Sequence, residues 1–160
     1  MQDLGRFKMN PPLRNKDDQE ALLAGLLDGT IDMIATDHAP HSAEEKAKGL
    51  RGSAMGVVGI ETAFPLLYTY LVETGKMPLE MLIDRMADAP RRRFRIDGGM
   101  QVGDKAAVTV FDLHAREKID PNTFLSKGRA TPFEGWKVHA ACRLTICGDK
   151  IAYNALSRKE

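Results

Sequence analysis

The spacing of hydrophobic and polar residues changes along the chain. Residues 1–95 carry apolar residues mostly at helical intervals, whereas residues 96–160 carry short apolar runs separated by glycine turns. Recurrence at every third or fourth position is typical of an amphipathic helix, and short bounded runs are typical of strands. We therefore predict an α/β fold with two domains, residues 1–95 and residues 96–160.

Three helices are predicted in the first domain. The first follows N-cap candidates at residues 15–17, carries leucines at helical spacing and ends at Gly29. The second covers residues 59–73, with Pro65 in its early turns, where proline costs least. The third runs from Pro78 to Ala89, and Pro90 is expected to end or kink it. Residues 42–56 show no clear period and are predicted to be a mobile loop.

Strands are predicted on both sides of the first helix. Residues 4–12 look like a short strand stopped by two prolines, and Ile31–Thr36 is an apolar run of the kind found in buried parallel strands. A strand, a helix and a second strand within about thirty residues form a βαβ unit, which predicts a parallel sheet.

The second domain is predicted to be rich in strands. Residues 107–111, 138–147 and 150–153 are β-prone, and Gly148-Asp149 between the last two is a hairpin turn signal. Residues 157–160 are predicted to be a frayed tail.

Composition and charge narrow the class of protein. Hydrophobic residues make up 43% and charged residues 28%, with a net charge of +1, so neither nucleic acid nor an anionic membrane is expected as a partner. No apolar run approaches the ~20 residues that a membrane span needs. The two cysteines, Cys142 and Cys147, are five apart, which predicts reduced thiols in a cytoplasmic protein.

The candidate catalytic residues lie at the end of the apolar run Ile31–Thr36. Asp37 and His41 follow that run directly, and reactive groups in α/β barrels sit at the carboxyl ends of strands. Asp37 is therefore a candidate catalytic carboxylate. A carboxylate that caps a turn and an exposed loop histidine are the alternative interpretations.

Five stretches resemble bacterial dihydroorotases of the metal-dependent amidohydrolase superfamily. They are KMNPPLR (8–14), IDMIATDHAPHSAEEK (31–46), GVVGIETAFPLL (56–67), VGDKAAVTVFD (102–112) and FLSKGRATPFEGW (124–136). Hydantoinases and allantoinases share the TDH or SDH core but usually lack the APH that follows it, so His41 favours dihydroorotase.

The resemblance implies a fold, an activity and a cofactor. The fold would be the C-terminal part of an amidohydrolase TIM barrel, followed by a small β-rich module. The activity would be reversible interconversion of L-dihydroorotate and N-carbamoyl-L-aspartate in pyrimidine synthesis, with Zn²⁺, usually two ions, as cofactor. The family's HxH pair is absent from these 160 residues, so the chain is expected to be a fragment and inactive alone.

The resemblance also implies roles for five residues. Asp37 would be a metal ligand and the general acid/base, and Asn10 and His41 would bind the substrate. Met55 and Gly56 match a substrate-binding position at which the family commonly has phenylalanine before the glycine. The alternative for Asn10 is turn chemistry before Pro11.

Partners and two other functions follow from the same resemblance. A small-molecule substrate is expected, together with homo-oligomerisation or association with the missing N-terminal half, because a sheet fragment leaves edges that pair with other chains. Aspartate transcarbamoylase is a possible partner. The alternative functions are a non-catalytic dihydroorotase-like assembly partner of that enzyme and a hydantoinase-like cyclic amidase.

Overall fold

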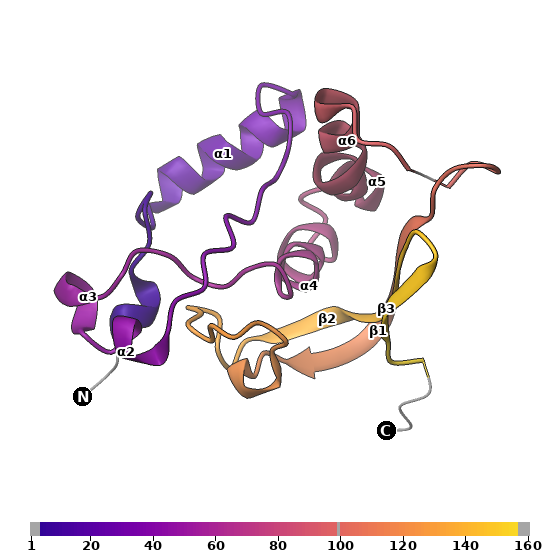
Figure 1. The fold of residues 1–160 in the computed structure, drawn as a ribbon. Coiled ribbons are helices and arrows are strands. Elements are labelled where there is room, and N and C mark those ends of the chain that lie inside the picture. The colour runs from indigo at the N-terminus through magenta and orange to yellow at the C-terminus, as the bar shows by residue number, and fades with distance from the viewer. Residues whose placement is uncertain (1–3, 99, 157–160) are drawn as a thin grey trace. The chain divides into compact units, whose positions relative to one another are not determined.

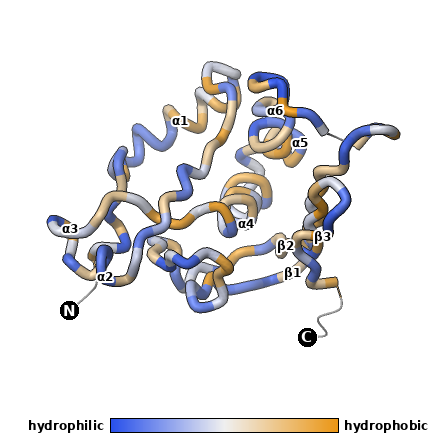
Figure 2. The backbone as a smooth tube through the Cα atoms, viewed as in Figure 1, coloured by the Kyte–Doolittle hydropathy of each residue, from blue (hydrophilic) through white to orange (hydrophobic). Residues whose placement is uncertain are grey.

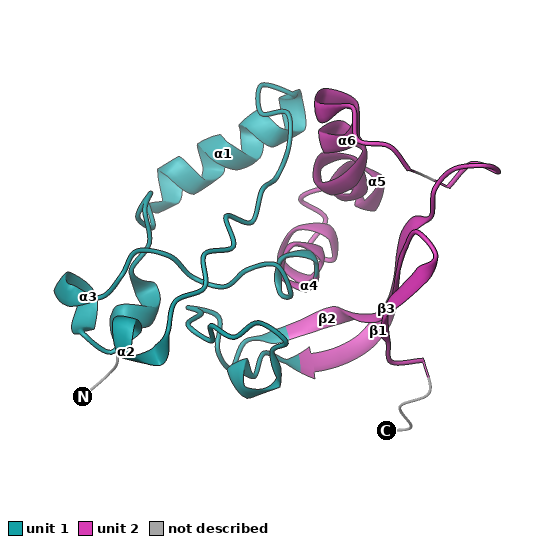
Figure 3. Ribbon diagram, in the orientation of Figure 1, with its two compact units in different colours: residues 1–64, 118–137 teal, residues 65–117, 138–160 magenta. Residues whose placement is uncertain are grey.

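The computed structural model describes residues 4–98 and 100–156, and its helices and strands are labelled in Figure 1. The predicted tail at residues 157–160 lies outside the described residues. Contacts divide the chain into two compact units, shown in Figure 3: unit 1 comprises residues 1–64 and 118–137, and unit 2 comprises residues 65–117 and 138–160. The predicted domains, residues 1–95 and 96–160, remain a prediction for the protein.

Helix α1 (Lys16–Asp28) in unit 1 confirms the first predicted helix. The Asn15 side chain accepts a hydrogen bond from the backbone N–H of Asp18, and Gly29 ends the helix in the left-handed conformation. Both are standard ways to satisfy the free backbone groups at helix ends. Figure 2 shows hydrophobic positions interspersed with hydrophilic ones along α1, and the Leu22 side chain is exposed.

The two strands predicted beside α1 are not formed, so this prediction was wrong for the described residues. Leu4–Phe7 is a 3-10 helix, and residues 31–36 have no regular strand pairing. A single parallel bridge joins His38 to Val57, where the Ala39 N–H also donates to the Val57 carbonyl at 3.0 Å. A strand needs a neighbour along its length, and the described residues provide only this short pairing.

The segment predicted to be a mobile loop contains two short helices instead. They are α2 (Ala43–Lys46) and α3 (Gly49–Gly52). Helix α2 begins with a capping box, in which the Ser42 hydroxyl accepts from the Glu45 N–H and the Glu45 carboxylate accepts from the Ser42 N–H. The pattern Ser-x-x-Glu signals such a start, although four residues are too few to show a helical period.

The second and third predicted helices are present in modified form. Their parts are α4 (Ala63–Leu67) with a π-helical turn at Tyr68–Val72, and α5 (Leu79–Ile83), a π-helical turn at Asp84–Asp88 and α6 (Ala89–Phe94). Pro90 does not end the helix: it lies in the first turn of α6, where a missing N–H is tolerated, and the wider turn precedes it. Arg95, in the left-handed conformation, ends α6 instead.

The described strands form a three-stranded sheet in the order β1-β2-β3. They are β1 (Ala107–Lys118), β2 (Lys137–Cys147) and β3 (Lys150–Asn154). β2 and β3 pair antiparallel around Gly148, whose φ of 63° suits the turn. The predicted hairpin is therefore confirmed. The strand predicted at residues 107–111 is also present, as β1, and it extends seven residues further than expected.

The interiors of the two units differ in chemistry. The buried residues of unit 2 are mostly apolar, and Met77 and Leu82 are its largest fully buried side chains. Unit 1 buries Val58 and Ile119 together with four polar residues, namely Lys46, Ser53, Thr62 and Thr131. Each of these four polar side chains makes a hydrogen bond within unit 1, as buried polar groups usually do. Among the described residues, no helix is long and apolar enough to cross a membrane.

Candidate functional site

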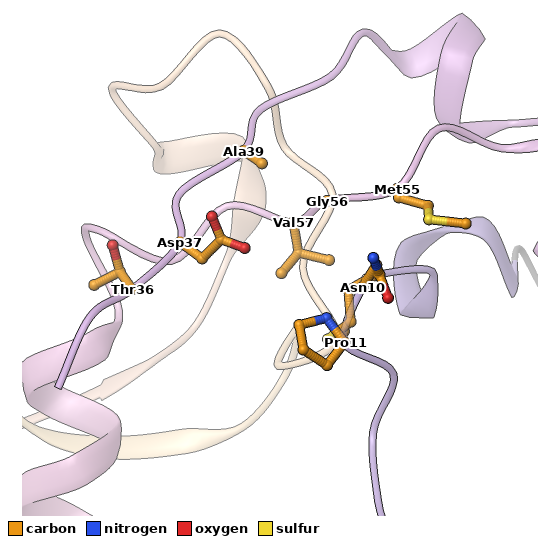
Figure 4. Close-up of a pocket in the computed structure, with 9 residues that line it drawn as sticks. Asn10, Pro11, Thr36, Asp37, Ala39, Met55, Gly56 and Val57 are labelled. Carbon is orange, nitrogen blue, oxygen red and sulfur yellow. The ribbon is translucent and has the colours of Figure 1, made fainter. Parts of the chain in front are cut away.

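A cavity of about 200 Å³ in unit 1 gathers most of the predicted site residues (Figure 4). Its walls are formed by Met9, Asn10, Pro11, Thr36, Asp37, Ala39, Met55, Gly56 and Val57. Four of the five predicted site residues, separated by as many as 46 positions, thus face one space. His41 does not line the cavity.

Asp37 presents an exposed carboxylate to this cavity. Its backbone has φ of 44°, in the left-handed region that aspartate tolerates better than most residues. Within the described residues its side chain has no hydrogen bond or ion pair, so the carboxylate is open to a ligand. This differs from the capping interpretation, in which the carboxylate would accept a backbone N–H.

His41 contacts Met55, which lines the cavity, although His41 itself is not a lining residue. Its Nε2 atom lies 2.9 Å from the Met55 carbonyl oxygen, so Nε2 must carry the hydrogen and donate. Its Nδ1 atom lies 3.7 Å from a Glu45 carboxylate oxygen, which forms an ion pair when the ring is protonated. His41 therefore orients the backbone between Met55 and Gly56 in this structure.

Gly56 is required by close packing at the same point. Its φ is 136°, and an added Cβ would lie 2.6 Å from the Ala39 Cβ and 3.0 Å from the His41 Nε2. Its N–H donates to the Lys8 carbonyl at 3.0 Å, which ties this wall to the segment that carries Asn10. Any larger residue at position 56 would clash with Ala39 and His41 and would need a backbone conformation that L side chains rarely adopt.

The other histidine of the motif serves a different segment. The His38 Nδ1 accepts from the N–H of Gly59 at 3.2 Å and from the N–H of Ile60 at 3.4 Å. A nitrogen that accepts these hydrogen bonds has no lone pair left for a metal. His38 thus fixes the chain after the Val57 wall.

The donor set in this chain does not by itself form a metal centre. No group of three or more His, Cys, Asp or Glu able to hold a metal occurs among the described residues. Asp37 is the single acidic residue lining the cavity. Catalytic zinc usually has three protein ligands, so a metal at Asp37 would need ligands from outside the described residues.

Sequence reasoning missed the residues that support the cavity. Lys46 is buried and bonded to three backbone carbonyls, and Glu61 and Gly128 hold a distant loop against the turn that contains Pro40. Lysine is almost never fully buried, so a lysine at position 46 of the sequence gave no sign that it would support the cavity from inside. The FLSKGRATPFEGW stretch was recognised, but nothing in it predicted this contact.

Solved structures with a similar fold define the class of protein. The L-hydantoinase (dihydropyrimidinase) of Arthrobacter aurescens matches with a TM-score of 0.84 and 30% identity over 96% of this chain and 36% of its own. The D-hydantoinase of a Thermus species matches with a TM-score of 0.82 and 27% identity over 94% of this chain and 34% of its own. The chain thus has the fold of a segment of these amidohydrolases.

Relatives found by sequence narrow the family further than the solved structures do. The chain is 57% identical over 148 residues to the dihydroorotases of Anoxybacillus flavithermus and Bacillus cereus, which covers 92% of this chain and 35% of each relative. This identity confirms the predicted resemblance to the dihydroorotases. The chain spans about a third of the length of these curated relatives. No protein-family model matches it.

Proposed function

We propose that this chain forms the C-terminal part of a dihydroorotase, which interconverts L-dihydroorotate and N-carbamoyl-L-aspartate. The observation that carries the proposal is the 57% identity to dihydroorotases over 92% of the chain, against 30% or less to the two hydantoinases. The cavity supports it, because four of the five residues that the resemblance assigns to the site line one space.

In this proposal, Asp37 moves the proton during opening and closing of the ring. Its carboxylate would take a proton from the attacking water and deliver it to the departing ring nitrogen, as general acid/base groups do. Asn10 would bind the ring through its amide, which can both donate and accept. The backbone at Met55 and Gly56 would orient the substrate, and His41 would act on the substrate through the Met55 carbonyl that its Nε2 holds.

The proposed cofactor is zinc, with two ions in the complete site. Asp37 would supply one ligand, and the others would come from outside the described residues. Zinc would lower the pKa of a bound water towards neutrality. The single carboxylate in this cavity is not enough to form a zinc site, which usually has three protein ligands.

The remaining parts of the proposal concern the whole protein. Residues 1–95 would be the last part of a TIM barrel and residues 96–160 a β-rich module. The complete protein would act in the cytoplasm on a small molecule, as a homo-oligomer or together with an N-terminal half. Association with aspartate transcarbamoylase belongs to the alternative, non-catalytic function.

The test is reconstitution of activity. The 160-residue chain is co-expressed with the part of the Anoxybacillus flavithermus dihydroorotase that lies outside the matched residues, and the purified complex is assayed for dihydroorotate hydrolysis. We expect turnover by the complex and none by the chain alone. In the complex, Asp37→Asn should lower kcat by about 100-fold or more, because general acid/base catalysis contributes at least that much.

The control is Asp32→Asn, an exposed aspartate in the same segment that does not line the cavity, and it should leave kcat unchanged. Turnover of hydantoin or dihydrouracil without dihydroorotate would instead support a hydantoinase-like amidase. A folded, zinc-containing complex with no activity on any of these substrates would support the non-catalytic assembly role.

A further inference from the structure

The Lys46 ammonium is the buried charge next to the cavity. The residue is only 3% exposed, and its Nζ donates to the carbonyls of Lys8 at 3.0 Å, Ala54 at 2.8 Å and Gly56 at 2.7 Å. An ammonium has three N–H donors, and here three oxygens accept them. Burying a charge is costly unless such partners replace the water, so this geometry is tightly specified.

The three carbonyls belong to two segments that are far apart in sequence. Lys8 directly precedes the stretch that lines the cavity at Met9–Pro11, and Ala54 and Gly56 flank Met55, which also lines it. One backbone hydrogen bond, from the Gly56 N–H to the Lys8 carbonyl, also joins them. The ammonium therefore binds the walls that carry Asn10 and Gly56 at a fixed spacing.

The backbone of Lys46 is itself held in place. The buried Ser53 hydroxyl donates to the Lys46 carbonyl at 2.7 Å, and the Lys46 N–H donates to the Ser42 carbonyl at 3.1 Å. Gly5 packs so closely on the Lys46 carbonyl oxygen that an added Cβ would lie 1.8 Å from it. The lysine thus extends from a fixed base towards the cavity walls.

We propose that Lys46 is a positioning residue that sets the distance between the Asn10 wall and the Met55–Gly56 wall of the cavity. It does not touch the substrate; it acts through the backbone of these walls. Its effect on substrate binding rests on the proposed dihydroorotase function, whereas its effect on the walls is a property of the chain itself.

The first test measures the walls directly, by amide hydrogen exchange of the full chain and of its Lys46→Met variant. The amides of Lys8, Ala54 and Gly56, which are hydrogen-bonded in the structure, should exchange at least about tenfold faster in the variant, because local opening governs exchange. The amides of Ile119 and Gly135, which bond within the same unit, should keep their rates. Lys48→Met, at an exposed lysine two residues away, is the matched control and should change none of them.

Uniform acceleration throughout unit 1, or no acceleration at Lys8, Ala54 and Gly56, would overturn the proposal. Lys46→Arg keeps the test decisive if methionine prevents folding. The guanidinium retains the charge and several donors but not the ammonium geometry, so the amides of Lys8, Ala54 and Gly56 should exchange faster than in the unmodified chain, while those of Ile119 and Gly135 keep their rates.

The second test uses the reconstituted complex with the full chain. Lys46→Met should raise KM for dihydroorotate about tenfold while kcat changes less. Displaced walls should weaken substrate binding more than they slow the proton transfer at Asp37. If the wall amides exchange faster in the Lys46→Met variant but KM is unchanged, the spacing of the walls does not control substrate binding. An unmodified complex without activity would refute the proposed function, and the exchange result would still decide the role of Lys46 in the walls.

Discussion

Gly128 lies where a loop from the second half of the chain meets the turn between Asp37 and His41. The Glu61 carboxylate accepts hydrogen bonds from the N–H groups of Leu125 at 2.9 Å and Ser126 at 3.0 Å, which holds the loop in place. Gly128 is buried, and an added Cβ would lie 2.6 Å from the Pro40 Cβ and 2.8 Å from its Cα. A backbone atom and a proline ring cannot move aside, so this position has no room for a side chain.

Gly128→Ala should therefore lower the free energy of unfolding by about 1–3 kcal/mol, the usual cost of overpacking. The measurement is urea denaturation of the chain. Gly25→Ala is the comparison: its Cβ would meet the flexible end of the Ile31 side chain at 3.1 Å, and alanine favours the helix by up to about 1 kcal/mol over glycine. Equal losses in the two variants would contradict the packing argument.

Four of the five residues that the sequence assigned to the site line the cavity, but the sequence did not predict what holds them there. Asn10, Asp37 and Gly56 belong to short motifs, so their resemblance to a family was sufficient to group them. Lys46 and Gly128 act through contacts with backbone atoms of distant segments. Such contacts depend on where the chain passes in space, which neither spacing nor residue type specifies.

Among the elements, helix α1 shows the clearest dependence on a terminal residue. Asn15→Ala removes the acceptor of the Asp18 N–H at 2.9 Å and should destabilise the chain by about 1 kcal/mol. Asn15→Asp retains an acceptor and should cost much less. Urea denaturation followed by circular dichroism measures both variants, and equal losses would show that the cap does not matter.

The capping box of helix α2 should stabilise the fold in a pH-dependent way. Hydrogen bonds from the Ser42 backbone and, to a smaller extent, its side chain lower the pKa of Glu45 from its ordinary value of 4.5. A lowered pKa in the folded state means that the box stabilises the fold above that ordinary value, and that this contribution is lost as the pH falls through the lowered pKa.

Carboxyl NMR titration of the chain should therefore give a pKa for Glu45 below 4.5. Ser42→Ala should raise that pKa only part of the way back, because the Ser42 N–H, the larger cause, remains. A pKa at or above the ordinary value in the unmodified chain would contradict the capping box.

Helices and strands were predicted correctly where the signal lay within the segment itself. The predictions were wrong where the structure depends on a second segment. Helix α1 has caps at both ends, and the β2–β3 hairpin has a glycine turn, so each was predicted. The run Ile31–Thr36 is apolar enough for a buried strand, yet most of it has no strand partner among the described residues. Pairing is a property of two segments, and an apolar pattern in one of them cannot supply the other.

At the scale of the whole molecule, the described residues include many large hydrophobic side chains that are exposed. Large hydrophobic side chains at least half exposed include Leu13, Leu22, Leu50, Ile60, Phe94 and Leu125. Exposed apolar side chains that lie together are typical of surfaces that another chain or segment covers. This accords with the proposal that the complete enzyme contains further parts.

The isolated chain should therefore self-associate as its concentration rises. Light scattering after size-exclusion chromatography, over a dilution series, measures this. The association should persist at high salt, because screening weakens charge pairs but not apolar contacts. A monomer at every concentration would contradict the expectation, and co-expression with the complementary part of the relative should suppress the self-association.

The left-handed backbone at Asp37 determines which variants of that residue can be interpreted. With φ at 44°, the position favours aspartate, asparagine and glycine over residues with other side chains. Alanine there would remove the carboxylate and impose a conformational cost at once, so a lost activity would have two explanations. Asparagine keeps both shape and backbone preference, and it separates the loss of a proton-carrying group from the loss of local geometry.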